Sequence, residues 1–197
     1  PARFEDIAVE VAIVRPGPIQ GGAVHPYLRR RTGEEPVTYL HPCLKPVLAE
    51  TLGVLLFQEQ AIRVAVEAAG FKPGEADLLR RALSRNRSQE AMAALRERFV
   101  RGAQERGIEA LVAEAIFQQL AGFAGYGFCK SHAASFALIA YVTCWLKCNH
   151  PAEFVCSLLN SQPMGFYSPS QLIQDARRHG VVVRPADVAF SDRESRV

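Results

Sequence analysis

Apolar residues recur every three or four positions along most of the 197-residue chain, a spacing that places them on one face of an α-helix. Gly70 and Gly107 are suited to end a helix, and Pro73 is suited to begin one. Helices are therefore expected over residues 4–14, 52–69, 73–83, 89–105, 109–123, 131–148, 152–159 and 168–179. The pattern predicts a mainly α fold.

Three stretches break the helical pattern. Residues 15–46 are rich in Gly, Pro and Arg and begin with two prolines, which lock φ and donate no backbone hydrogen bond, so we expect a loop to about residue 46. Residues 122–128 hold three glycines and three aromatic residues, which predict a tight, packed connection. Three consecutive valines at 181–183 predict a short strand near the C-terminus.

Composition narrows the class of protein. With 49% hydrophobic and 22% charged residues, the chain suits a domain with a real core rather than a disordered tail or a membrane protein. Its most apolar run, residues 133–146, is shorter than the roughly 20 residues that span a bilayer. No signal peptide appears, and five cysteines without a C-x-x-C pair are typical of reduced thiols in a cytoplasmic protein. The start without a methionine and the polar end lead us to expect a fragment.

Positive charge is concentrated rather than spread. The net charge of +3 says little, but residues 80–106 hold eight arginines against three glutamates, and Arg29, Arg30 and Arg31 form a second basic spot. Such a run is the electrostatic footprint of a surface that follows a nucleic-acid backbone.

Arg80 and Arg81 adjoin near the end of one expected helix. Neighbouring helical residues point about 100° apart, so one guanidinium can face a phosphate while the other braces it or binds a second phosphate. Their spacing alone favours the plainer interpretation of a solvated basic face.

The junction of the Gly-rich connection and the long apolar helix carries Cys129, Lys130, Ser131 and His132. Backbone donors at a helix start, a lysine, a hydroxyl and an imidazole suit phosphate or sugar recognition. The same residues also fit a Ser131 N-cap, a lysine in solvent and a half-buried histidine.

Carboxylates that would hold catalytic metal ions are not evident. Glu59 and Asp77 stand singly within helical stretches, and the chain has neither a D-x-D pair nor a Gly-x-x-x-x-Gly-Lys loop. Two-metal nucleotidyl transfer needs carboxylates for both ions. We therefore predict no catalytic residue and no metal site in this chain.

Several stretches, in order and in register across residues 5–188, resemble the fingers region of the bacterial C-family DNA polymerases, the family of the replicative polymerase III alpha subunit. They are residues 14–20, 53–60, 76–82, 123–128 and 130–134, and then 145–147 with 150–154. Residues 20–31, 159–167 and 174–180 resemble the error-prone, damage-inducible branch, which acts with accessory proteins in mutagenic bypass of lesions. At residues 129–130 the replicative branch usually begins with Asn and the error-prone branch reads Pro-Glu, whereas this chain has Cys129-Lys130.

The resemblance implies a reaction and assigns roles. A primer 3′-hydroxyl attacks the α-phosphate of a deoxynucleoside triphosphate, and two Mg²⁺ ions are held by palm aspartates outside this chain, which alone would be inactive. Nucleotide contacts are assigned to the triphosphate-binding pair Arg80 and Arg81 and to the sugar-flanking residues Cys129, Lys130, Ser131 and His132, of which Ser131 and His132 would exclude a 2′-hydroxyl. Contacts to the DNA backbone are assigned to Arg15, Arg85 and Arg87 and to the rest of the basic run up to Arg106.

The resemblance also implies an organisation and partners. Residues 1–46 would end the palm and lead into the fingers, residues 47–160 would form the helical fingers core, and residues 161–197 would be a truncated distal segment. Expected partners are primer-template DNA, deoxynucleoside triphosphates, mutagenesis accessory proteins and the sliding clamp, in the cytoplasm and without a membrane. A non-catalytic helical nucleic-acid-binding domain and a helical interaction module are the alternatives, and the ordered motifs favour the polymerase.

Overall fold

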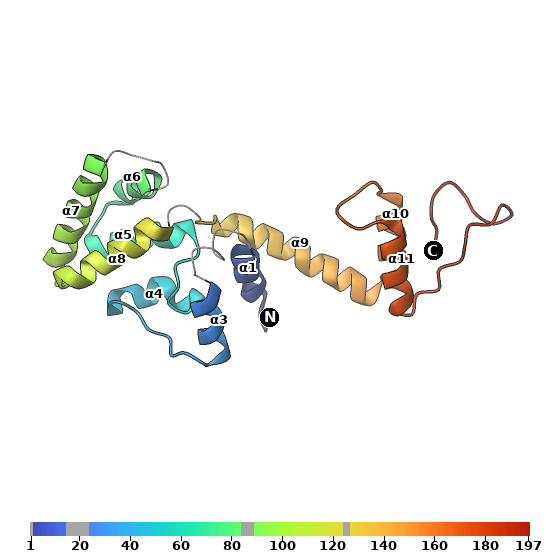
Figure 1. The fold of residues 1–197 in the computed structure, drawn as a ribbon, viewed down its shortest axis with the longest axis horizontal. Helices are drawn as coiled ribbons and strands as arrows, with labels where there is room; N and C mark the ends of the chain where they lie inside the picture. Colours follow the sequence, from blue (N-terminus) through green and yellow to red (C-terminus); the bar gives the residue numbers. More distant parts are fainter. Residues whose placement is uncertain (1, 15–23, 84–88, 124–126) are drawn as a thin grey trace. The chain divides into compact units, whose positions relative to one another are not determined.

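A computed structural model describes residues 2–14, 24–83, 89–123 and 127–197 (Figure 1). The helices in chain order are α1 (Phe4–Ile13), α3 (Val24–Thr32), α4 (Lys45–Leu48), α5 (Gln58–Ala69), α6 (Pro73–Leu83), α7 (Gln89–Glu105), α8 (Ala110–Phe123), α9 (Lys130–Asn149), α10 (Pro151–Asn160) and α11 (Pro169–Arg178). Two 3₁₀ turns, η1 (Pro42–Leu44) and η2 (Ala49–Thr51), flank α4. The predicted mainly α class is confirmed.

Most helix boundaries follow the expected signals. Gly70 ends α5 in the left-handed conformation with φ of 67°, and α6 begins at Pro73, where the missing N–H has no partner to lose. The helix α7 covers the predicted residues 89–105, and α9 extends the predicted range by one residue at each end.

The expectation of a loop over residues 15–46 is wrong in part: residues 15–23 lie outside the described residues, residues 33–41 form no helix as expected, and the rest is helical. Residues 24–32 form α3, and residues 42–51 form η1, α4 and η2. Pro26, Pro42 and Pro46 each stand in the first turn of one of these elements, where proline interrupts no intrahelical hydrogen bond. The prolines therefore mark helix starts here and do not exclude helices.

The start of α5 was also predicted too early. Leu52 and Gly53 take left-handed φ values of 54° and 80°, and the chain then runs extended to Phe57. The buried side chain of Gln60 stabilises this turn, because its Oε1 accepts the backbone N–H groups of Leu56 and Phe57 at 3.0 Å each. The apolar residues from residue 52 onward have helical spacing, but the left-handed backbone at Gly53 prevents the helix from beginning there.

The strand predicted at residues 181–183 does not form. These residues adopt no regular structure, and the Val183 carbonyl accepts a hydrogen bond from Arg177 Nη2 at 3.1 Å instead of from a neighbouring strand. A strand needs a partner for its backbone groups, and β-propensity does not supply one. Among the residues described, the single β-bridge pairs Phe57 with Phe128.

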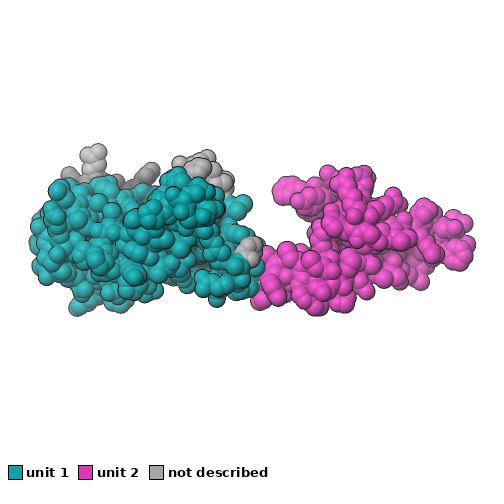
Figure 2. Space-filling model, turned by 90° about the horizontal axis from the view of Figure 1, so that it is seen from below, with its two compact units in different colours: residues 1–137 teal, residues 138–197 magenta. Residues whose placement is uncertain are grey.

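The chain forms two compact units, residues 1–137 and residues 138–197, which Figure 2 shows in separate colours. In unit 1, α5 contacts α6 and α7, and α7 contacts α8. Phe99 is fully buried at the centre of this bundle, with its ring 6.1 Å from the ring of Phe71 and 5.6 Å from that of Phe117. A second cluster packs α1 and Phe57 against the start of α9.

Unit 2 consists of the rest of α9, α10, α11 and the C-terminal tail, and α10 packs on α11. Its buried apolar residues among those described are Val155 and Ala176, so its core is small. Among the residues described, no helix combines the length and the apolarity that a bilayer crossing demands. The predicted division of the chain at residues 46 and 160 is a statement about polymerase subdomains and stays a prediction.

Candidate functional site

Arg80 and Arg81 share one carboxylate on α6. Asp77 Oδ1 accepts Arg80 Nε at 3.0 Å and lies 2.9 Å from Arg80 Nη2, and Asp77 Oδ2 lies 2.8 Å from Arg81 Nε. The hydrogen bond from Arg80 is the main reason that the pKa of Asp77 is lowered. The side chain of Arg80 is 21% exposed and that of Arg81 is 62% exposed. The guanidinium of Arg81 is therefore more accessible to solvent than that of Arg80.

Gln58, the first residue of α5, joins Arg80 to the connection before α9. Its Oε1 accepts Arg80 Nη1 at 3.2 Å, and its Nε2 donates to the Gly127 carbonyl at 3.0 Å. Its backbone N–H donates to the Phe128 carbonyl at 2.8 Å. A Cβ on Gly127 would lie 2.7 Å from the Phe123 ring and 3.1 Å from Gln58 Cγ, so glycine is what permits this close approach.

The N-terminus of α9 is held by carboxylates from unit 1. Both oxygens of Glu59 accept the Lys130 backbone N–H, at 3.0 and 2.9 Å, and Oε1 also accepts Cys129 Sγ at 3.3 Å. Lys130 Nζ reaches Glu50 Oε2 at 2.6 Å. Negative charge at this position complements the helix dipole and satisfies a donor that the helix leaves unpaired.

Ser131 and His132 lie in the first turn of α9. Because the helix begins at Lys130 and the Cys129 carbonyl accepts the Ala133 N–H at 3.1 Å, the cap position belongs to Cys129, and the alternative of a Ser131 N-cap is wrong. Ser131 Oγ lies 3.0 Å from Cys129 Sγ and is exposed. The imidazole of His132 lies edge-on between the rings of Phe128 and Phe136, at 5.3 and 4.7 Å.

Much of the basic run serves packing within unit 1. Arg96 pairs with Glu114 at 2.7 Å, Arg98 lies over the Phe71 ring at 4.8 Å, and Arg106 Nη1 donates to the Glu67 carbonyl at 3.3 Å. Arg96 thus joins α7 to α8, Arg98 joins α7 to the connection between α5 and α6, and Arg106, the residue after α7, contacts α5. These three arginines of the run therefore have partners within unit 1. The predicted DNA contacts Arg15, Arg85 and Arg87 lie outside the described residues.

The second basic spot is also committed to internal contacts. Arg31 Nη1 reaches Asp6 Oδ1 at 2.9 Å and joins α3 to α1. The Arg31 hydrogen bond is the main reason that the pKa of Asp6 lies far below its usual range. Arg30 Nη1 donates to the Leu52 carbonyl at 2.8 Å and so holds the turn before α5.

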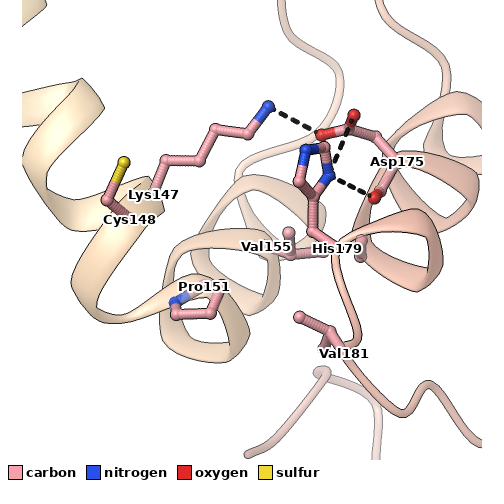
Figure 3. Close-up of a pocket in the computed structure, with 8 residues that line it drawn as sticks. Lys147, Cys148, Pro151, Val155, Asp175, His179 and Val181 are labelled. Atoms are coloured by element: carbon pink, nitrogen blue, oxygen red, sulfur yellow. Dashed lines mark hydrogen bonds and ion pairs between the residues drawn. The ribbon is translucent and has the colours of Figure 1, made fainter.

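Unit 2 contains a cavity of about 280 Å³ that the sequence did not indicate (Figure 3). Lys147 and His179 approach Asp175 at its rim, with Lys147 Nζ 2.8 Å from Oδ2 and His179 Nδ1 3.4 Å from Oδ1. The Lys147 hydrogen bond lowers the pKa of Asp175. The apolar lining of the cavity includes Val155 and Ala176.

A metal site is not formed by the described residues, because no three His, Cys, Asp or Glu side chains among them come together. Glu50, Glu59 and Asp77 already contact a lysine, a backbone amide and two arginines, respectively. The described carboxylates therefore do not fit a pair of Mg²⁺ ions.

The profile of the bacterial DNA polymerase III alpha subunit finger domain matches residues 1–107. The chain belongs to this family. The chain is also 63% identical over 195 residues to the error-prone DNA polymerase of Anaeromyxobacter dehalogenans, 58% identical to that of Teredinibacter turnerae and 57% identical to that of Bordetella bronchiseptica. Each match covers 99% of this chain but only 17–19% of the relative. The resemblance to the error-prone branch of the C-family polymerases is thereby confirmed.

Proposed function

We propose that this finger domain positions the incoming deoxynucleoside triphosphate, and with it primer-template DNA, in an error-prone DNA-directed DNA polymerase. One observation carries the proposal. Gln58 forms hydrogen bonds to Arg80 and to Gly127 just before α9, and its neighbour Glu59 accepts the first amide of α9, in a chain that matches error-prone polymerases along 99% of its length. Guanidinium groups and a helix start are both suited to phosphate oxygens.

The arginines would hold the triphosphate by exchanging partners. The Asp77 carboxylate pairs with both guanidinium groups and holds them in place. A triphosphate offers several oxygens in the same bidentate geometry as a carboxylate and carries more charge, so it can replace Asp77. Arg81, which is 62% exposed, would make the first contact, and Arg80 would follow.

The start of α9 would lie beside the nucleotide sugar. His132 is held between two aromatic rings, and Ser131 precedes it in a turn whose first amide is fixed by Glu59. Rejection of a 2′-hydroxyl by steric contact needs a wall that does not yield. The ring contacts and the fixed amide support this role, and the side chains of Ser131 and His132 are exposed and so accessible to a nucleotide. Cys129 and Lys130 would set the position of that wall, through Glu59 and Glu50.

The remaining parts of the proposal rest on the family. Mg²⁺ would supply the Lewis-acid chemistry of the transfer and would be held by carboxylates outside this chain. Arg15, Arg85 and Arg87 would contact the DNA backbone. Translesion repair synthesis after DNA damage, mutagenesis accessory proteins, a sliding clamp and a cytoplasmic location complete the proposal.

The test is a chimaeric polymerase in which this chain replaces the matching segment of the Anaeromyxobacter dehalogenans relative. We expect primer extension by the chimaera and no extension by the isolated chain. Replacing Arg80 or Arg81 by Ala should lower kcat/KM for deoxynucleotides about 10-fold or more, since each removes a charge-assisted phosphate contact. His132→Ala should change the ratio of ribonucleotide to deoxyribonucleotide use.

Arg178→Ala is the matched control, because Arg178 is an exposed arginine on α11, outside both the proposed nucleotide site and the basic run. It should leave kcat/KM within about twofold of the parent. Unchanged nucleotide use in both Arg80→Ala and Arg81→Ala would overturn the proposal. A chain that binds DNA but cannot restore extension in the chimaera would favour a non-catalytic nucleic-acid-binding domain.

A further inference from the structure

The side-chain amide of Gln58 uses its two ends on two different parts of the proposed site. Its oxygen accepts Arg80 Nη1 at 3.2 Å, and its nitrogen donates to the Gly127 carbonyl at 3.0 Å. These partners are 22 and 69 residues away in the sequence. An amide is the side-chain group that offers an acceptor and a donor in one plane, so both contacts depend on glutamine chemistry.

The backbone around Gln58 makes this bridge short and directional. The Gln58 N–H donates to the Phe128 carbonyl at 2.8 Å, and the adjacent residue Phe57 forms a β-bridge with Phe128. The absence of a Cβ at Gly127 allows the chain to come within 3.1 Å of Gln58 Cγ, measured from the position that a Cβ would take. The α5 start and the residues before α9 are therefore fixed to each other by main-chain and side-chain contacts together.

We propose that Gln58 is a positioning residue that sets the spacing between the triphosphate-binding arginine and the sugar-flanking start of α9. The inference rests on the proposed function and adds a residue to it. A nucleotide has a fixed distance between its phosphates and its sugar, so two gripping parts on separate helices must hold a matching distance. Misplacement by about 1 Å is enough to cost a large factor in rate, on the order of 100-fold in demanding sites.

Three substitutions test the bridge, and one of them, Gln58→Glu, separates its two hydrogen bonds. Gln58→Ala removes both. Gln58→Glu keeps an acceptor for Arg80 but places a carboxylate oxygen against the Gly127 carbonyl. It therefore removes only the hydrogen bond to Gly127, and it adds negative charge near the triphosphate. Gln58→Met retains the length of the side chain and removes both hydrogen bonds, which separates bonding from packing.

Gln118 provides the matched control. It is an exposed glutamine on α8, and its Nε2 donates to Glu114 Oε1 at 2.9 Å. Its amide therefore forms a hydrogen bond within α8 and contacts neither Arg80 nor Gly127. Gln118→Ala should leave the deoxynucleotide KM and the ratio of ribonucleotide to deoxyribonucleotide use at the parent values.

The decisive experiment measures kcat and KM for deoxynucleotides and ribonucleotides in the chimaera. We expect Gln58→Ala and Gln58→Met to raise the deoxynucleotide KM about 5- to 10-fold, the size of effect that loss of a net hydrogen bond produces, and to change the sugar ratio. Gln58→Glu should raise KM and also change the sugar ratio. In an Arg80→Ala background, Gln58→Ala should lower kcat/KM by less than about threefold, because the two residues act through one contact.

The outcomes distinguish the inference from the proposed function. If Arg80→Ala itself left nucleotide use unchanged, the proposed function would fail. If Arg80→Ala lowered kcat/KM but the Gln58 variants kept the parent KM and sugar ratio, only the inference would fail. Full additivity of Gln58→Ala and Arg80→Ala, or a change of sugar ratio in Gln118→Ala equal to that in Gln58→Ala, would also overturn it.

Discussion

The two ends of α9 carry the same kind of ion pair in different surroundings. Lys130 pairs with Glu50 at 2.6 Å and Lys147 pairs with Asp175 at 2.8 Å, and the two lysine side chains are 48% and 45% exposed. At the N-terminal end the backbone is also anchored, since Glu59 holds the first amide and Ala133 and Ala137 are completely buried. From residue 141 to residue 150 every residue is exposed.

The comparison shows that an exposed ion pair does not by itself position a helix end. Exposed pairs contribute little, on the order of 0–1 kcal/mol, because both partners lose side-chain entropy and are screened by solvent. Burial of apolar surface and a backbone hydrogen bond to a fixed carboxylate distinguish the Lys130 end. The proposed role in nucleotide positioning therefore rests on the Lys130 end of α9 and not on the ion pair in unit 2.

The largest expected difference is in stability. Phe99→Ala removes a fully buried ring from the core of unit 1 and should lower the free energy of unfolding by about 3–5 kcal/mol. Phe166→Ala in unit 2 is the matched control, because Phe166 is fully exposed, and its effect should stay within about 0.5 kcal/mol. Denaturant titration of the isolated chain measures both. Similar losses in the two variants would contradict the contrast between a packed and a sparsely packed unit.

A smaller difference is expected between the two lysines. In the chimaera, Lys130→Ala should lower kcat/KM for deoxynucleotides about 10-fold, because it removes a cation beside the anchored start of α9. Lys147→Ala removes an equally exposed lysine and should change kcat/KM by less than about twofold. Steady-state primer extension checks this. If the two substitutions lowered kcat/KM equally, the anchoring of the helix end at Lys130 would have no bearing on nucleotide use.

The smallest expected effect is on the loss of stability at acid pH. The pKa of Asp6 in unit 1 is lowered, first by Arg31 and then by the backbone N–H groups of Arg3 and Ala2, and the pKa of Asp175 in unit 2 is lowered chiefly by Lys147. A carboxylate with a lowered folded pKa binds fewer protons when folded than when unfolded. Its contribution to stability is therefore complete above the usual aspartate pKa of about 4 and is lost as the pH falls through the folded pKa.

Melting temperatures between about pH 6 and pH 2 measure this contribution in the isolated chain. Asp6→Asn should flatten the acid decline of the melting temperature more than Asp175→Asn does, since Asp6 has more donors. A steeper acid decline in Asp6→Asn than in the parent chain would refute the sign of this argument.

Local signals in the sequence were sufficient for most helices and misleading at a few points. The periodicity predicted α6 and α7 to the residue. It missed α3 and α4, where Pro26 and Pro46 were interpreted as loop residues. The valines at 181–183 predicted a strand, for which the described part of the chain offers no partner. The Asp77 contacts to Arg80 and Arg81 are readable from their three- and four-residue spacing on one helix, but this pairing was not predicted.

The sequence alone determined the helical class, the family and the residues of the site that lie close together along the chain, because helix periodicity, capping and ordered motifs are local properties. Only the tertiary structure decided that Gln58 joins Arg80 to Gly127, that Glu59 rather than Ser131 holds the first amide of α9, and that much of the basic run packs internally. The physical reason is that these contacts join residues from 18 to 71 positions apart. Which hydrogen-bonding groups meet across such distances is set by the packing of whole helices, which no local pattern encodes.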